Sequence, residues 1–189
     1  MPGATAGVEL DADGVLACAR QIPSPNFDDR PAGCAIELLV VHNISLPPAQ
    51  FGGPGILEFF TNRLDPHAHP YYREIAGMKV SSHFLVRRDG ELVQFVPCGR
   101  RAWHAGASQW KGRDRCNDFS IGVELEGTDD QAFDDAQYET LVGLTRTLRH
   151  HYPIVDCAGH SEIAVPAGRK TDPGLYFDWP RFRAMLDRR

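Results

Sequence analysis

The sequence predicts an α/β protein with a mixed central sheet and helices on both faces. Residues 36–41 are apolar at all positions but one, which is typical of a central strand covered on both sides. Residues 80–96 contain two apolar runs joined by an Asp-Gly pair, which indicates a β-hairpin. Between residues 138 and 148, apolar side chains recur at helical spacing, which predicts a helix that packs against the sheet.

The first part of the chain leads into the predicted central strand. Residues 1–35 are rich in proline, glycine and acids, so we expect a loop-rich lead-in, with the fold proper beginning after Gly33. The strand over residues 36–41 ends at His42 and Asn43. Side chains that leave the ends of central strands commonly build the binding sites of α/β sheets, so this position favours a functional role for His42.

The remaining elements follow in order. Prolines and glycines over residues 47–55 predict a shaped loop that walls a cleft, followed by a short helix over residues 56–60. After the hairpin, residues 119–127 alternate so that apolar side chains share one face of a strand and Glu124 and Glu126 share the other. The acids at 134–135 predict the start of a helix that runs to about His151. A last short helix is expected over residues 179–186.

Composition limits the class of protein. A chain of 189 residues that is 42% apolar and 24% charged suits one soluble domain over residues 1–189. Its net charge of -5 offers no basic surface for nucleic acid or anionic lipid, so we expect a small-molecule or protein partner, no nucleic acid and no membrane. The N-terminus lacks the basic start and apolar stretch of a signal peptide, and the scattered cysteines predict no disulfide framework. We therefore expect a cytoplasmic protein, and we expect it to be a monomer.

Three residues are predicted to bind one zinc ion. His42, His160 and Asp172 supply the two imidazoles and one carboxylate that a catalytic Zn²⁺ needs when its fourth position stays open for water. The alternative for each histidine alone is a hydrogen-bonded structural role, because histidine is commonly part-buried. The spacing by itself does not decide between these interpretations.

Two further side chains complete a candidate catalytic site. In an extended segment residues i and i+2 face the same way, so Lys170 is expected beside the Asp172 carboxylate, where an ammonium stabilises a developing oxyanion. Glu124 is the candidate general base that takes a proton from water and passes it to a leaving amine. Alternation alone leaves Glu126 open for the same role. The simpler alternatives are a solvated loop lysine and carboxylates on a solvated sheet face.

Other reactive side chains give weaker signals. No activated-thiol signature surrounds Cys116, so a small buried thiol is the expected state. His83 lies within a predicted strand and is expected in the core or behind the metal ligands. The chain contains no GxSxG sequence, and the glycines at 52–55 lack the context of a phosphate-binding loop.

Four stretches closely resemble one family of zinc amidases. They are Val41-His42-Asn43-Ile44-Ser45-Leu46-Pro47-Pro48, Arg101-Ala102-Trp103-His104-Ala105-Gly106, Cys116-Asn117-Asp118-Phe119-Ser120-Ile121-Gly122-Val123-Glu124-Leu125-Glu126-Gly127 and Arg169-Lys170-Thr171-Asp172-Pro173-Gly174. The resemblance, over about residues 20–185, is to the AmpD-type 1,6-anhydro-N-acetylmuramyl-L-alanine amidases. That family is related to the peptidoglycan recognition proteins, so the resemblance implies their fold.

The resemblance implies an activity and residue roles. The reaction is hydrolysis of the amide between 1,6-anhydro-N-acetylmuramic acid and the L-alanine of the stem peptide, in cytoplasmic muropeptide recycling in Gram-negative bacteria. One Zn²⁺ per chain is implied at His42, His160 and Asp172, with Glu124 rather than Glu126 acting on the water and Lys170 stabilising the transition state. An indirect influence on β-lactamase induction is implied as well.

Substrate contacts are implied at a second set of positions. Asn43, Trp103 and Arg115 match positions that line the family's pocket, which suits a sugar against an aromatic face and a carboxylate met by guanidinium. Lys79 stands where the family pattern has an arginine, so a bidentate grip on a stem-peptide carboxylate becomes a point-charge contact.

Two rival functions remain. One is a catalytically silent module that binds peptidoglycan fragments, and retention of the ligands with Glu124 and Lys170 argues against it. The other is a periplasmic amidase acting on intact murein, which a signal peptide would favour.

Overall fold

The computed structural model describes residues 9–188. The strands are β1 Arg20–Gln21, β2 Phe27–Asp29, β3 Leu38–Ile44, β4 Phe84–Val86, β5 Leu92–Gln94, β6 Arg100–Ala102, β7 Gln109–Trp110, β8 Arg113–Asp114, β9 Ser120–Glu126 and β10 Asp156–Gly159. The helices are α1 Gly55–Phe60, α2 Pro70–Ile75, the 3₁₀ helix η1 Cys116–Asp118, α3 Asp135–His151, α4 His160–Ile163 and α5 Trp179–Asp187. None of the helices within residues 9–188 is long and apolar enough to cross a membrane.

The predicted mixed sheet is confirmed. Its strand order is β1-β5-β4-β9-β3-β10, with β3 in the interior as its apolar run predicts. Strand β3 pairs in parallel with β9 and β10, β4 pairs in parallel with β9, and β4 and β5 form the predicted antiparallel hairpin. Gly90 holds φ +86° in the hairpin turn, a conformation that glycine adopts without steric cost. Strand β3 extends to Ile44, so His42 and Asn43 are among its last three residues rather than beyond its end.

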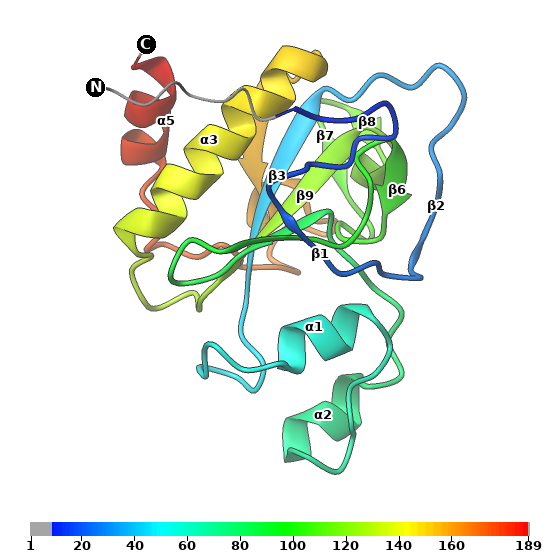
Figure 1. Ribbon diagram of the computed structural model, residues 1–189, viewed down its shortest axis with the longest axis vertical. Coiled ribbons are helices and arrows are strands. Elements are labelled where there is room, and N and C mark those ends of the chain that lie inside the picture. The colour runs from blue at the N-terminus through cyan, green and yellow to red at the C-terminus, as the bar shows by residue number, and fades with distance from the viewer. Residues whose placement is uncertain (1–8, 189) are drawn as a thin grey trace.

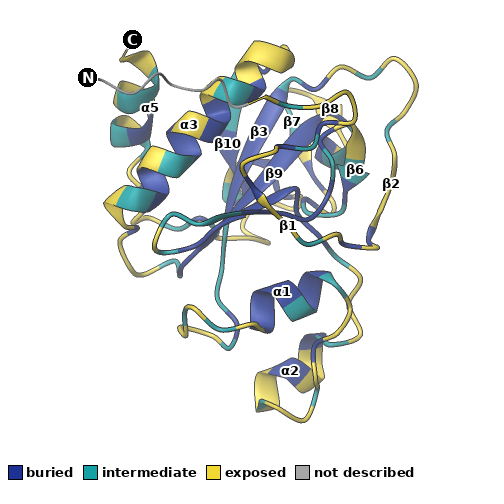
Figure 2. Cartoon of the chain, in the orientation of Figure 1, coloured by how far each residue is buried: buried dark blue, intermediate teal, exposed yellow. Residues whose placement is uncertain are grey.

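One face of the sheet packs into the main core, and the other carries polar side chains. Ile121, Val123 and Leu125 of β9 belong to the main core, together with the buried side of α3 and with Phe182 of α5. Figure 2 shows that α3 is buried along the side that faces the sheet and exposed on its outer side. The opposite side chains of β9 point to the other face, which therefore carries the polar groups of the strand.

Helices α1 and α2 belong to the second face. Their apolar side chains form a cluster with Leu85 of β4 and Val93 of β5, and α4 contributes Ile163 to a smaller cluster with Val40. Figure 1 shows α1 and α2 beyond the end of the sheet where β3 leads into them. Helices on both faces of the sheet are thus confirmed. The polar end of β3, at His42 and Asn43, lies on the side of the sheet where β3 leads into α1.

The N-terminal lead-in is more structured than expected. Strand β1 pairs in parallel with β5, β2 pairs antiparallel with β6, and Leu16 is only 1% exposed within the main core. The fold therefore begins well before Gly33, because β1 covers the hydrogen-bonding edge of β5 that would otherwise be open. Residues 1–8 of the lead-in lie outside the described residues.

Candidate metal centre and active-site pocket

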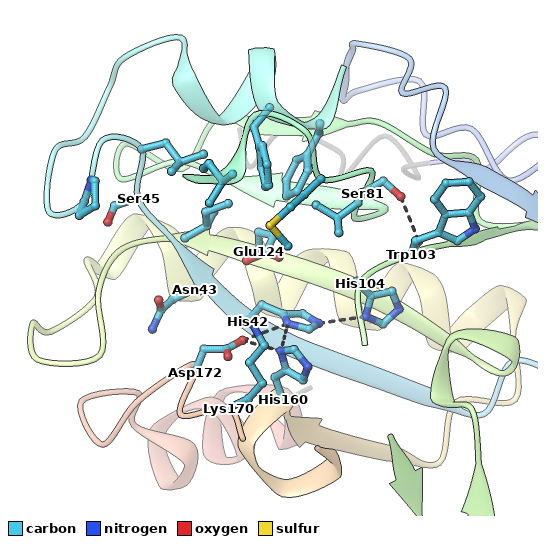
Figure 3. A pocket seen from close by; sticks show the side chains of 18 of the residues that line it. His42, Asn43, Ser45, Ser81, Trp103, His104, Glu124, His160, Lys170 and Asp172 are labelled. Atoms are coloured by element: carbon cyan, nitrogen blue, oxygen red, sulfur yellow. Dashed lines mark hydrogen bonds and ion pairs between the residues drawn. The ribbon is translucent and has the colours of Figure 1, made fainter. Parts of the chain in front are cut away.

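His42, His160 and Asp172 converge at one point. The Nδ1 atoms of the two histidines are 3.0 Å apart, and each lies 3.0 Å from Oδ2 of Asp172. Both histidines are buried. Within residues 9–188 this is the one group of three side chains whose ligand atoms are close enough to share a metal ion, and Figure 3 shows it at the floor of a pocket.

The fold brings the ligands together from three segments. His42 lies on β3, and His160 begins α4 directly after β10, whose Gly159 is in register with Val41. Gly159 is needed there, because a Cβ would lie 2.8 Å from Cδ of Pro173. The backbone N–H of Ser161 donates to the carbonyl of Asp172 over 2.9 Å. The loop that carries the carboxylate is therefore tied to the helix that carries the second histidine.

The donor set fits a metal ion. His160 Nε2 lies 3.1 Å from the carbonyl of Ala105, which only accepts hydrogen bonds, so Nε2 carries the ring proton and Nδ1 faces the cluster with a lone pair. Burial lowers the pKa of His42 to about 4, which keeps its imidazole neutral, the form that binds metals. Burial alone would raise the pKa of Asp172, but hydrogen bonds to His160 and His42 outweigh it and keep the pKa well below its usual range. The imidazole nitrogens of His42 and His160 and the Asp172 carboxylate thus face one another in a buried place. A bound cation would offset the electrostatic repulsion between these groups.

Glu124 lies beside the cluster on the next strand. Strand β9 places it in register with His42 of β3, and both side chains point to the same face. Burial raises the pKa of Glu124 well above its usual range, the charge of Asp172 adds to the shift, and the charge of Lys170 opposes it. Its Oε2 atom has no hydrogen-bond partner within the described part of the chain. A buried carboxyl with a raised pKa and a free oxygen is suited to exchange protons with a water or substrate.

Glu126 has a different environment on the same strand. Its carboxylate accepts hydrogen bonds from the backbone N–H groups of Gly52 at 2.7 Å and Arg88 at 3.2 Å, and pairs with the Arg87 guanidinium at 3.3 Å. The side chain therefore holds the loop after β3 against the hairpin. Of the two carboxylates that alternation left open, Glu124 lines the pocket beside the ligands.

Lys170 approaches the cluster from the loop that carries Asp172. It is exposed and lines the same pocket as Glu124 and the three ligands. The neighbouring Thr171 hydroxyl donates to Asp129, whose other carboxylate oxygen accepts from the Asn43 side-chain amide at 2.7 Å. Asp129 thus links the end of β3 to the segment between Lys170 and Asp172.

The pocket has one polar and one apolar side. It encloses about 360 Å³ above the three candidate metal ligands and Glu124. Most of its opposite wall comes from α1, α2 and the loops around them, through the side chains of Leu46, Phe59, Phe60, Tyr71, Ile75 and Met78. The predicted shaped loop after β3 thus leads into this wall. A ligand with both apolar and amide or hydroxyl groups suits such a pocket.

The four predicted substrate contacts fall into two groups. Asn43 and Trp103 line the pocket, and Trp103 is fixed by a hydrogen bond from its Nε1 to Asp28 at 3.1 Å. Arg115 is exposed and its guanidinium lies 3.2 Å from Asp118, while Lys79 is exposed between the lining residues Met78 and Val80. These last two side chains are not part of the pocket lining, and their substrate contacts stay predictions.

Two features of the site had no role in the sequence interpretation. His104 lines the pocket with Nδ1 2.9 Å from Nε2 of His42, although its stretch was singled out for resemblance only. The other is α2, a six-residue helix for which the sequence has no periodic apolar pattern. His69 accepts from the N–H of Tyr71 and Pro70 follows at the first helical position, which is the signal that marks the start of this short helix.

Over residues 9–188, fold and site define a mixed-sheet α/β protein with one candidate metal centre in a substrate-sized pocket. Comparison with known proteins agrees with this class. A family model described as N-acetylmuramoyl-L-alanine amidase matches residues 32–175. The 1,6-anhydro-N-acetylmuramyl-L-alanine amidase AmpD of Salmonella typhimurium (strain SL1344) is 58% identical over 179 residues, which is 94% of this chain and 95% of that protein.

Solved structures give the same result. A crystal structure of a Se-Met AmpD derivative is 57% identical, with a TM-score of 0.90 over 94% of this chain and 99% of that one. Escherichia coli AmiD, solved with the substrate anhydro-N-acetylmuramic acid-L-Ala-D-gamma-Glu-L-Lys, is 27% identical, with a TM-score of 0.58 over 85% of this chain and 65% of that one. The chain belongs to the N-acetylmuramoyl-L-alanine amidase family.

Proposed function

We propose that this chain is a zinc-dependent 1,6-anhydro-N-acetylmuramyl-L-alanine amidase. The observation that carries the proposal is the register pair of His42 and Glu124, which puts a buried carboxyl next to a cluster of two histidines and Asp172. The similarity to proteins of that activity spans nearly the whole chain. The geometry supports metal-assisted hydrolysis, and the similarity supports the bond between the lactyl carbonyl and the L-alanine nitrogen as the one cleaved.

His42, His160 and Asp172 would hold one Zn²⁺. When bound, zinc supplies Lewis acidity that polarises the amide carbonyl and makes a neighbouring water more acidic. The two imidazoles are buried, so water competes little for their lone pairs. Catalytic zinc sites use such a two-histidine, one-carboxylate donor set, and membership of the amidase family supports zinc as the ion.

Glu124 is proposed as the group that moves the proton. It takes a proton from the attacking water as the oxygen–carbon bond forms, and it gives that proton to the alanine nitrogen as the carbon–nitrogen bond breaks. The products are a lactyl carboxylate and a free α-amino group. The raised pKa of Glu124 supports this cycle, because a higher pKa makes the ionised carboxylate a stronger base towards the attacking water.

Lys170 is proposed to stabilise charge on the carbonyl oxygen. Its ammonium lines the pocket with Glu124 and the ligands, and an exposed stem gives it freedom to reach a bound substrate. The carbonyl oxygen becomes negative in the transition state, so a nearby cation stabilises that state more than the substrate.

Substrate orientation follows from the two sides of the pocket. The amide lies at the polar floor, and the apolar wall with the Trp103 ring accommodates the sugar ring and the non-polar parts of the peptide. An AmiD structure with an anhydromuramyl peptide supports this class of ligand. The contacts of Asn43, Lys79 and Arg115 with the substrate belong to the proposal and call for direct tests.

The proposal also covers the setting of the reaction. The enzyme is proposed to act as a monomer with a single zinc amidase domain. We place the reaction in the cytoplasm, where the family that the motifs resemble recycles cell-wall fragments. The alternatives are a silent binding module and a periplasmic enzyme acting on intact murein.

The experiment compares Glu124→Gln with the parent. We expect kcat for anhydromuramyl-tripeptide to fall by about 10²–10⁴-fold, because an amide cannot exchange the proton, while zinc content stays at one per chain. Glu139→Gln, on the exposed side of α3, is the matched control and should keep parental activity. Near-parental turnover by zinc-loaded Glu124→Gln would remove Glu124 from the mechanism, and a parent that binds substrate without cleaving it would favour the binding module.

A further inference from the structure

His104 contacts His42 on the side away from the metal ligands. Its Nδ1 atom lies 2.9 Å from Nε2 of His42, while Nδ1 of His42 faces His160 and Asp172. The two rings meet edge to face, with centroids 5.0 Å apart. His104 is therefore not a fourth ligand in this arrangement, although it touches a ligand directly (Figure 3).

The hydrogen bonds behind His104 have only one consistent direction. The Ser120 hydroxyl donates to the carbonyl of Cys116 at 2.6 Å, and a hydroxyl has a single proton to donate. The contact of 3.2 Å between Ser120 Oγ and His104 Nε2 must then be donated by the histidine. A neutral imidazole carries one ring proton, so Nδ1 of His104 is an acceptor.

This direction determines the tautomer of His42. Because Nδ1 of His104 accepts, the hydrogen bond between the two histidines is donated by Nε2 of His42. The lone pair of His42 is then on Nδ1, the atom that faces the ligand cluster. His160 reaches the same state through the Ala105 carbonyl, so both imidazoles present lone pairs to one point.

The backbone below His104 keeps its ring in place. A Cβ on Gly122 would lie 2.5 Å from Cγ and 2.7 Å from Nδ1 of the His104 ring, so the strand has room for the ring only because this residue is glycine. The backbone N–H groups of His104 and Ala105 both donate to the Asn117 side-chain oxygen, at 3.1 and 2.8 Å. The ring is thus fixed from its own backbone, from Ser120 and from the face of β9.

We propose that His104, oriented by Ser120 and packed on Gly122, is a positioning residue that keeps His42 in the Nε2-protonated tautomer and thereby raises the affinity of the site for zinc. The identity of the metal rests on the proposed function. Neighbours that orient a ligating histidine typically change metal affinity by about 10–100-fold when they are removed.

The first test measures zinc affinity. The zinc-free full chain is titrated with Zn²⁺ against a competing chelator for the parent, His104→Leu and His104→Asn. We expect His104→Leu to weaken zinc binding by about 10–100-fold. In His104→Asn the side-chain oxygen can take the place of Nδ1 as acceptor, so much of the affinity should return. His150→Leu, at the exposed end of α3, should bind zinc like the parent.

Two further variants address the support of the ring. Gly122→Ala should displace His104 and weaken zinc binding in the same direction, and Ser120→Ala should weaken it by removing the acceptor for Nε2–H. Ser120→Ala removes only one oxygen atom, so it keeps the test informative if the larger changes disturb folding. Circular dichroism of the zinc-free proteins checks that each variant is folded.

The second test observes the tautomer without metal. Imidazole ¹⁵N shifts in the zinc-free parent should show His42 protonated at Nε2, and His104→Leu should show a mixture of tautomers. A zinc-free parent protonated at Nδ1 would overturn the proposal. Parental zinc affinity in folded His104→Leu and Ser120→Ala would overturn it too, while leaving the amidase assignment intact. The assignment itself fails on a different result, a parent that releases no peptide.

Discussion

At the scale of single residues, the site depends on buried imidazoles that stay neutral. His83, behind the site, accepts from the N–H of Gly122 at Nδ1 and contacts the Arg100 carbonyl through Nε2, so both of its nitrogens are engaged. Burial lowers the pKa of His83 to about 3, and the charge of the neighbouring Arg30 acts in the same direction. Protonation of His83 at Nδ1 would place its new N–H next to the Gly122 N–H, so this hydrogen bond would be lost.

This arrangement predicts the pH dependence of stability. The unfolded chain binds a proton at His83 near its ordinary pKa of about 6.5, while the folded chain does so only near pH 3, so stability is present above pH 6.5 and falls as pH decreases. The expected slope is up to about 1.4 kcal/mol per pH unit from this residue. His42 and His104 change stability in the same direction, because burial lowers their pKa values as well.

Urea unfolding of the zinc-free chain between pH 7.5 and pH 5 measures the slope. In His83→Asn the side-chain oxygen can still accept from Gly122, but the residue no longer titrates, so the decline in unfolding free energy should be shallower than in the parent. Equal slopes for the two proteins would contradict the assignment.

At the scale of elements, α3 is joined to the sheet at its first turn. Gln137 is fully buried, accepts from the N–H of Asp134, and donates to the carbonyls of Val86 and Glu126. It therefore connects the helix start to the ends of β4 and β9, the strand that carries Glu124. The main core below this contact contains Leu141 and Leu148 of the same helix.

Replacing this side chain should destabilise the protein. Gln137→Leu keeps the bulk but leaves buried backbone groups without partners, so we expect the unfolding free energy to fall by about 1–3 kcal/mol in urea denaturation. Glu139→Ala, exposed on the same helix, should change it by less than about 0.5 kcal/mol. Equal effects of the two substitutions would show that the three hydrogen bonds of Gln137 contribute little.

Elements with strong periodic patterns could be predicted from the sequence, and those whose stability comes from distant contacts could not. The interior strand β3, the hairpin and α3 follow from apolar spacing and turn residues. Strand β1 has only two residues and exists because β5 offers an edge to pair with, which local sequence does not report. Helices α2 and α4 are too short for a repeating pattern, so only their starting residues mark them.

In the site, too, some features could be predicted from local sequence and others depend on distant contacts. The three candidate ligands could be proposed from residue type, with His42 also marked by its position at a strand end, and the structure brings them together. Alternation placed Glu124 and Glu126 on one face but could not separate them, because the Arg87 and Gly52 contacts of Glu126 come from remote segments. The role of His104 depends on hydrogen-bond directions through Ser120, which only coordinates reveal.

At the scale of the whole molecule, the fold places a polar pocket floor between two apolar layers. One layer is the core under α3 and α5, which keeps the central strands rigid, and the other is the α1 and α2 wall. Rigid strands carry His42 and Glu124, while loops carry Lys170 and Asp172. Candidate site residues held by strands and completed by a loop combine accurate geometry with access for a ligand.

The most direct test of the central claim measures zinc content and peptide release on the same sample. Mass spectrometry would follow release of tripeptide from anhydromuramyl-tripeptide by the full chain, before chelation, after chelation and after return of Zn²⁺. We predict one zinc per chain, loss of cleavage with the chelator and recovery with zinc. Cleavage that persists in the zinc-free protein, or zinc-loaded protein that binds the substrate and releases no tripeptide, would contradict it.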